Sequence, residues 1–159
     1  MSDLVLGIGN DIKRDDAVGL RLTEDLEARV DAPDVDFRTM TSGRIMLIDE
    51  MSGYDRVFIV DSIKTEGGTP GDWYRFCPDE VEPGDESGGL ATHNVGLGTL
   101  TTLGEAMGES MPEVTIFAVE VAEPFEYGEE MTDAVAEALP GLVEAIGAEL
   151  ADELGVEFD

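Results

Sequence analysis

Apolar residues of this chain gather in short runs that alternate with apolar positions at helical spacing. Residues 4–6 are three apolar residues followed directly by Gly7, which predicts a buried strand that ends in a loop. The next apolar positions recur every four residues and predict one face of a helix: Val18, Leu22, Leu26 and Val30. A strand, a loop and a helix in this order are typical of the start of an α/β sheet.

The same alternation continues along the rest of the chain. Three further strands are predicted at 35–40, 56–60 and 114–121, and the middle one has the continuous apolar run of a parallel sheet interior. A glycine-rich turn at 67–71 leads to a short strand, Trp73–Phe76, which we expect to lie antiparallel at an edge of the sheet.

Three more helices are predicted, at 45–51, at 95–107 and after residue 132. Thr132 is a suitable cap for the last helix, and Pro140 is expected to kink it or to end its first half. The apolar positions of this last helix keep helical spacing: Val135, Leu139, Leu142, Ile146 and Leu150.

Together these elements predict one α/β domain that spans residues 1–159. We expect three layers: a mostly parallel, twisted sheet of five strands, helices on both of its faces, and one short antiparallel strand at an edge. The central strand order is predicted to be 2-1-3, which places the strand at 4–6 between those at 35–40 and 56–60. A chain of 159 residues buries one core of ordinary size and leaves little for a second domain.

Acidic residues outnumber basic ones by 37 to 9, and the formal net charge is −28. Nucleic acid and anionic membranes are disfavoured as partners, because phosphate binding requires a basic surface. The acids recur through every segment instead of forming one tail, which is typical of a solvated acidic shell. Because about 1 M salt shortens the Debye length to roughly 3 Å, this halophile-like composition predicts a salt-rich surrounding.

The sequence also indicates where the protein is located and which cysteine chemistry is open to it. Residues 1–6 lack the basic start of an export signal, and no apolar run approaches the roughly 18 to 20 residues of a membrane span. We therefore expect a cytoplasmic protein, and a monomer. With Cys77 as the single cysteine, an intramolecular disulfide is impossible and a thiolate zinc cluster would need several more cysteines.

The loop that follows the first predicted strand contains glycines and acidic residues. The glycines within 7–9 suggest a phosphate cradle, but Ile12 stands where a dinucleotide-binding fingerprint has its third glycine. The acids within 11–16 would repel a pyrophosphate at the helix start. Asp15 and Asp16 could each cap the start of the following helix, but a cap needs only one of them. The other acid, kept ionised by the helix dipole, is a candidate metal ligand or general base.

Two further candidates are predicted to open onto the same edge of the sheet. Asp61 follows the four apolar residues 57–60, at the carboxyl end of a central strand, where open α/β sheets bind ligands; alternatively it caps a turn. His93, the only histidine, precedes a helical pattern, although a lone histidine is more often structural than catalytic. Two carboxylates and one imidazole form a ligand set that suits nickel, zinc, iron or manganese.

Four separated parts of the chain, in order, resemble the hydrogenase maturation endopeptidases. The resemblance places Asp16, Asp61 and His93 at the three metal-contact positions of that family. One departure is Thr39-Met40, because the family usually has a glycine pair there, in a loop that helps to recognise the substrate. The matching parts are 6–10 with 15–19, 53–61 with 67–71, 92–93 with 96–97, and 120–124 with 131–135.

The resemblance implies an endopeptidase that removes a short C-terminal extension from a hydrogenase large-subunit precursor. It further implies that nickel is supplied by the substrate, is not a resident cofactor, and meets Asp16, Asp61 and His93. The metal would polarise the scissile carbonyl or activate water, with Asp16 or Asp61 as the catalytic base. The alternative is a module that senses the metal of a metalloprotein precursor without cutting it. Cys77, with no histidine nearby in sequence, is expected to be an edge-strand hydrophobe.

Overall fold

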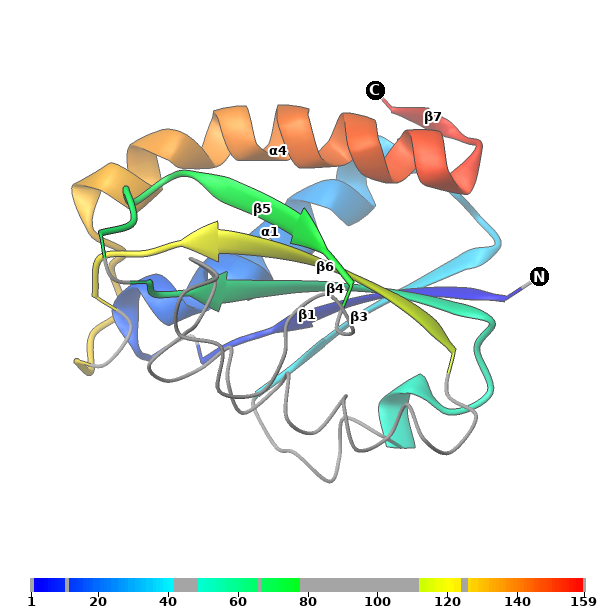
Figure 1. Cartoon of the computed structure of the whole chain (residues 1–159), viewed down its shortest axis with the longest axis horizontal. Coiled ribbons are helices and arrows are strands. Elements are labelled where there is room, and N and C mark those ends of the chain that lie inside the picture. The colour runs from blue at the N-terminus through cyan, green and yellow to red at the C-terminus, as the bar shows by residue number, and fades with distance from the viewer. Residues whose placement is uncertain are drawn as a thin grey trace.

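One five-stranded sheet forms the centre of the computed structural model, which describes residues 2–10, 12–41, 49–65, 67–77, 112–123 and 126–158 (Figure 1). Its strands are β1 (Asp3–Ile8), β3 (Val35–Met40), β4 (Arg56–Ile63), β5 (Trp73–Phe76) and β6 (Glu113–Glu120). They lie in the order β3-β1-β4-β6-β5. All neighbours run parallel except β5, which pairs antiparallel with β6. The predicted α/β class, the central strand order and the antiparallel edge strand are confirmed.

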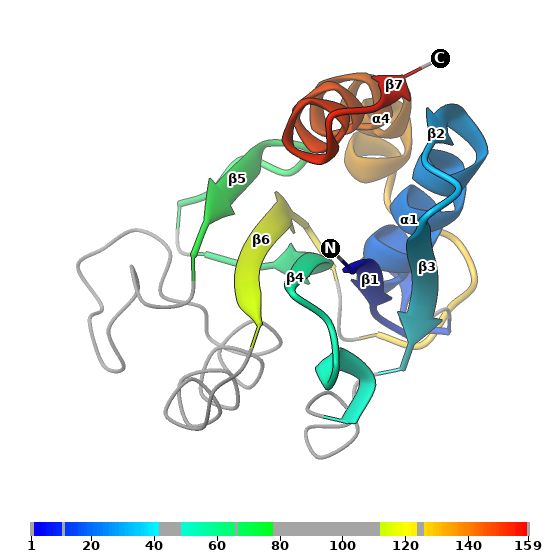
Figure 2. The ribbon, with the colours of Figure 1, turned by 90° about the vertical axis from the view of Figure 1, so that its right-hand side faces the viewer.

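Two long helices cover one face of this sheet. After β1, a short 3-10 helix, η1 (Arg14–Ala17), leads into α1 (Val18–Arg29), and α4 (Asp133–Leu154) follows β6. The two long helices contact each other and share one apolar core with the sheet (Figure 2). A short antiparallel pair that the sequence did not predict, β2 (Val30–Asp31) and β7 (Glu157–Phe158), joins the segments after them. No helix in the described ranges is long and apolar enough to cross a membrane.

The strands direct alternate apolar side chains to the two faces of the sheet. Phe58 and Phe117, with ring centroids 6.4 Å apart, lie in the core beneath α1 and α4. Ile59 belongs to the core of the opposite face, where Met51 from the helical turn at 49–51 packs. That turn is the end of the helix predicted at 45–51. Its earlier residues, and the whole helix predicted at 95–107, lie outside the described residues.

Three details of the predicted helices differ in the structure. Val30 follows α1 and belongs to β2, although its side chain stays buried. Pro140 does not end α4, because Leu139 and Val143 are buried on either side of it and tertiary packing holds the helix together as far as Leu154. Thr132 occupies the N-cap position, but its side chain makes no capping hydrogen bond.

The chain changes its direction across the sheet between β1 and β4. From β1 it passes through α1 to β3 and then crosses back to β4 on the other side of β1. The pairing of β1 with β4 ends at Gly7 and Val60, whereas β4 stays paired with β6 as far as Ile63. The end of β4 therefore projects beyond β1. The strand order reverses at this place, which we call the switch point, and open α/β sheets bind ligands at such points.

Gly19 allows the start of α1 to rest against this step. A Cβ atom on Gly19 would lie 2.3 Å from the carbonyl oxygen of Ile8 and 2.7 Å from that of Val60. The missing side chain therefore lets η1 and the first turn of α1 approach the projecting end of β4.

Candidate active site

Asp16 lies in η1 with its side chain almost fully buried at the switch point, 3% exposed. The hydroxyl of Ser62 donates a hydrogen bond to its Oδ1 at 2.8 Å. Burial raises the pKa of the Asp16 carboxyl above its ordinary value, and the Ser62 bond, the charge of Lys13 and the backbone of Asn10 oppose that rise in this order. A carboxyl in this setting is suited to proton transfer, since catalytic groups need a pKa shifted toward the working pH.

Asp61 is also buried, 3% exposed, and belongs to the part of β4 that projects beyond β1. The strand continues through Asp61 to Ile63, so the predicted strand end lies three residues too early. The backbone N–H of Ser62 donates a hydrogen bond to Oδ1 of Asp61 at 2.7 Å. Its position at the carboxyl edge of a central strand agrees with the sequence.

Ser62 links the two candidate acids, a role that was not predicted from the sequence. Its hydroxyl contacts Asp16 and its backbone N–H contacts Asp61, so both carboxyl groups lie around one residue of β4. Ser62 is 1% exposed. The available signal was a hydroxyl directly after Asp61, between the apolar residues of a buried strand and Ile63.

Asp15 holds distant segments together and caps no helix. Neither η1 nor α1 carries a side-chain cap, so the capping interpretation of this acid pair is wrong. The Asp15 carboxylate instead accepts hydrogen bonds from the backbone N–H groups of Ala122, Glu123 and Thr132 at 2.9, 2.7 and 2.6 Å. The Thr132 hydroxyl also donates to it, which explains why that hydroxyl does not cap α4.

Gly9 permits the chain to fold back over η1. A Cβ atom at this position would lie 2.2 Å from the carbonyl oxygen of Asp16. The Gly9 N–H donates to the carbonyl oxygen of Met40 at 3.1 Å, which ties the loop after β1 to the end of β3. Thr39-Met40, the departure from the expected glycine pair, therefore lies next to the loop that carries Asp16.

Glu120 is a third buried acid at the carboxyl edge, but its environment is that of a structural residue. Its carboxylate accepts from the Thr65 N–H and hydroxyl, at 2.7 and 2.5 Å, and from the Tyr74 hydroxyl at 3.0 Å. Burial, and secondly the bond to Glu120, raises the pKa of Tyr74. These bonds fasten the chain that follows β4 to the end of β6.

His93, the predicted third metal contact, lies outside the described residues. Within the described ranges, no three or more His, Cys, Asp or Glu side chains are grouped so that they would hold a metal ion. Asp16 and Asp61 are thus brought to one edge, and the three-residue metal contact stays a prediction. Cys77 directly follows β5 and is partly exposed, so it lies beside the predicted edge strand and not within it.

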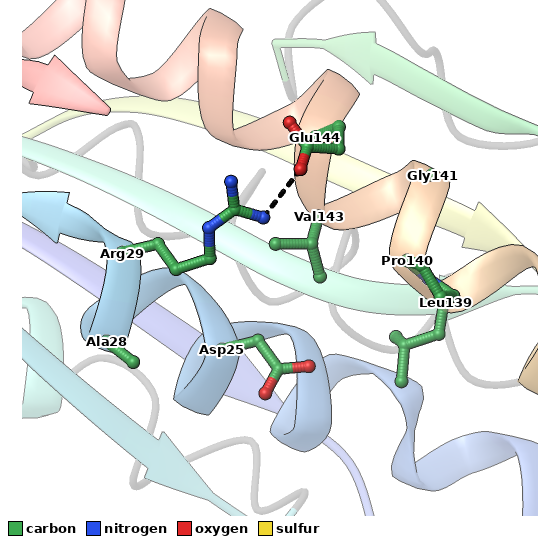
Figure 3. A pocket seen from close by; sticks show the side chains of 8 residues that line it. All are labelled: Asp25, Ala28, Arg29, Leu139, Pro140, Gly141, Val143 and Glu144. Atoms are coloured by element: carbon green, nitrogen blue, oxygen red, sulfur yellow. Dashed lines mark hydrogen bonds and ion pairs between the residues drawn. The ribbon is translucent and has the colours of Figure 1, made fainter. Parts of the chain in front are cut away.

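An open hollow lies away from this edge, on the outer side of the two long helices (Figure 3). The Arg29 guanidinium and the Glu144 carboxylate form an ion pair across it at 2.7 Å. Its lining contains none of the predicted site residues: Asp25, Ala28, Arg29, Leu139, Pro140, Gly141, Val143 and Glu144. The candidate chemistry therefore belongs to the sheet edge and not to this hollow.

An open α/β sheet with buried acids at its switch point defines a class of proteins that act on a substrate at the carboxyl edge of the strands. The model of one family, described as hydrogenase maturation protease, matches residues 20–149. The chain belongs to this family. Asp61 and His93 lie within the matched residues, and Asp16 lies just before them.

Individual relatives agree with this assignment. The chain is 30% identical over 120 residues to the hydrogenase 2 maturation protease of Escherichia coli K12, which covers 75% of this chain and 73% of that protein. The hydrogenase maturating endopeptidase HybD from E. coli has a similar structure, with a TM-score of 0.72, 27% identity and coverage of 99% and 96% of the two chains. A solution structure of an endopeptidase from E. coli gives a TM-score of 0.73 at 29% identity, covering 99% and 96%. The chain is an endopeptidase of the hydrogenase maturation type.

Proposed function

We propose that this endopeptidase removes a C-terminal extension from a nickel-loaded hydrogenase large-subunit precursor. In this proposal Asp16, Asp61 and His93 contact the nickel, which belongs to the substrate and is not a resident cofactor. The observation that carries the proposal is the double role of Ser62, which brings the Asp16 and Asp61 carboxyl groups to one strand edge. The family membership of the chain supports the hydrogenase precursor as the substrate.

The chemistry of the two acids suits both metal contact and proton transfer. A positive charge close to Asp16 would lower the pKa that burial raises, so the approach of a metal-loaded substrate would favour the ionised form of this carboxyl. An ionised Asp16 or Asp61 then accepts a proton from the water that attacks the scissile carbonyl, and returns it to the leaving amine as the peptide C–N bond breaks. The substrate's nickel polarises that carbonyl or activates that water. Recognition and catalysis would thus be coupled through the same edge.

The proposal is tested by cleavage of two forms of the precursor, with and without nickel. We expect mass spectrometry to detect loss of a C-terminal peptide from the nickel-loaded form only. Equal cleavage of the metal-free form would contradict nickel recognition. Binding of the loaded form with no change of mass would instead support a module that senses metal without cutting.

Asp61→Asn is the sharpest variant for the same assay. It keeps the shape of the side chain and removes its charge, so we expect cleavage to fall by at least about a hundredfold with a nearly unchanged melting temperature. Asp34→Asn is the matched control, because Asp34 is exposed and directly precedes β3, at the amino edge of the sheet. Full cleavage by Asp61→Asn would remove Asp61 from the mechanism.

A further inference from the structure

Two large apolar side chains stand out on the surface of this acidic protein. Ile12 is 50% exposed and Tyr127 is 75% exposed, and they are the exposed large hydrophobic residues of the described ranges. They come from opposite ends of the sequence, one in the loop after β1 and the other in the segment between β6 and α4. In Figure 1 both segments lie at the same end of the sheet.

The backbone holds these two segments together. The Gly128 N–H donates to the carbonyl oxygen of Ile12 at 2.8 Å, and the Arg14 N–H donates to the carbonyl oxygen of Gly128 at 3.0 Å. Lys13 and Gly128 form the parallel bridge between them. Ile12 and Tyr127 are therefore adjacent because specific hydrogen bonds fix both segments.

Two basic residues lie at the same place, among the acidic residues of the segment 126–130. The Lys13 ammonium lies 5.5 Å from the centre of the Tyr127 ring, and Arg14 is the next residue. Arg14 has a positive φ of 45°, a conformation that is strained for a residue with a Cβ and persists where surrounding contacts hold it. Here its side chain donates to the carbonyl oxygen of Glu130 at 3.1 Å and lies 3.6 Å from Glu126. Two of the nine basic residues thus flank this apolar pair in a chain of net charge −28.

This surface is continuous with the candidate active site. Lys13 is the N-cap residue of η1, the short helix that carries Asp16. The Asp16 N–H donates to the carbonyl oxygen of Lys13 at 3.0 Å, so Lys13 lies one turn before the candidate acid. The segment that carries Ile12 and Lys13 thus leads directly into η1, and Tyr127 lies beside it.

We propose that Ile12, Lys13 and Tyr127 form a docking platform for the precursor polypeptide beside its scissile bond. The platform takes an apolar side chain against Ile12 and Tyr127, and a carboxylate of the same segment on Lys13. An apolar side chain of the substrate gains burial against Ile12 and Tyr127, and a carboxylate beside it gains the attraction of Lys13 in a chain that is otherwise strongly acidic. This inference rests on the proposed function, because it takes the substrate to be that precursor.

Steady-state cleavage of the nickel-loaded precursor tests the platform. We expect Ile12→Ser and Tyr127→Ser each to raise KM about tenfold with kcat within about twofold, since these side chains contribute to binding and do not touch the reacting atoms. Ile12→Val and Tyr127→Phe keep the apolar surface and should behave like the wild type. All four variants change one of two exposed side chains, so their melting temperatures should agree.

A binding titration of the labelled precursor separates this inference from the proposed function. If the wild type binds the precursor without cutting it, the proposed cleavage is wrong, yet a tenfold weaker Kd for Tyr127→Ser still supports the platform. Lys13→Gln should weaken binding more than Lys13→Arg. Equal Kd values for the wild type, Ile12→Ser and Tyr127→Ser, or no binding by any of them, would overturn the platform.

Discussion

Buried acidic residues of this chain differ in how fully hydrogen bonds satisfy them. Asp15 and Glu120 each accept bonds from several donors of neighbouring segments, as structural carboxylates do. Asp16 has the Ser62 hydroxyl and the Asn10 backbone as hydrogen-bond donors, and burial is the largest influence on its pKa. Burying such a carboxyl next to the projecting end of β4 lowers the stability of the fold, and a functional role accounts for its presence there.

The raised pKa of Asp16 predicts a pH-dependent difference between the wild type and Asp16→Asn. The folded protein holds this proton to a higher pH than the unfolded chain, whose ordinary value is 3.8. The contribution of Asp16 to stability is therefore complete below about pH 3.8 and is lost as pH rises through the folded-state pKa. We expect Asp16→Asn to be more stable than the wild type near pH 7, with the advantage shrinking as pH falls.

Urea unfolding at constant high salt measures this difference across the pH range. The other acids are common to both proteins, so their contributions cancel in the comparison. Asp34→Asn, an exposed change of the same chemistry, should show no such advantage. An Asp16→Asn variant less stable than the wild type near pH 7 would mean that Asp16 serves the fold.

Among the elements, η1 is the one on which the site depends most. Gly19 lets it approach the end of β4, and Ser62 bonds its Asp16. Its other acid, Asp15, binds the segment that follows β6 and the start of α4. The position of Asp16 is thus coupled to elements more than a hundred residues away in the sequence.

Asp15→Asn is expected to loosen this connection. The side-chain NH2 group of the substituted asparagine would face backbone N–H groups, so hydrogen-bond donors would face each other without an acceptor. We therefore expect the free energy of unfolding to fall by about 3 kcal/mol. Urea unfolding measures the loss, and hydrogen exchange should show faster exchange at the Ala122, Glu123 and Thr132 amides. Asp133→Asn is the matched control, since this exposed acid in the first turn of α4 should change stability by less than about 1 kcal/mol. A similar small change for Asp15→Asn would contradict its structural role.

The whole molecule carries 37 acidic and 9 basic residues around one sheet and its two cores. Apart from the bidentate Arg56–Asp3 pair, whose carboxylate is buried, the ion pairs of the described residues lie on partly exposed side chains, and such pairs are individually weak. They do not offset the repulsion among so many acids. The composition therefore makes the stability of the fold depend on the surrounding salt.

We expect the melting temperature to rise steeply as KCl increases from about 50 mM to about 2 M. Most of the rise should occur below about 1 M, where the Debye length has already fallen to roughly 3 Å. Calorimetry across this series measures the effect, and added sucrose at low salt controls for a general effect of cosolutes. A melting temperature that is the same at both ends would refute the dependence on salt.

The sequence alone determined the elements whose local pattern is strong. The apolar run before Asp61 and the helical spacing of Val18, Leu22 and Leu26 reflect burial on a strand and on one helix face, which repeat along the chain. The order of the parallel strands could also be predicted, because short connections and right-handed crossovers leave few possible arrangements of the strands in the sheet. Asp16 and Asp61 could be expected at one edge for the same reason.

Tertiary structure alone decided how individual polar groups are used. The hydroxyl of Thr132 binds Asp15 instead of capping α4, and Ser62 joins Asp16 to Asp61, because each partner is distant in sequence. Pro140 stays within a helix because packing outweighs its lost hydrogen bond. The meeting of Ile12 and Tyr127 likewise needs the bridge to Gly128. Local periodicity encodes burial, whereas hydrogen bonds between remote segments exist only once the chain has folded.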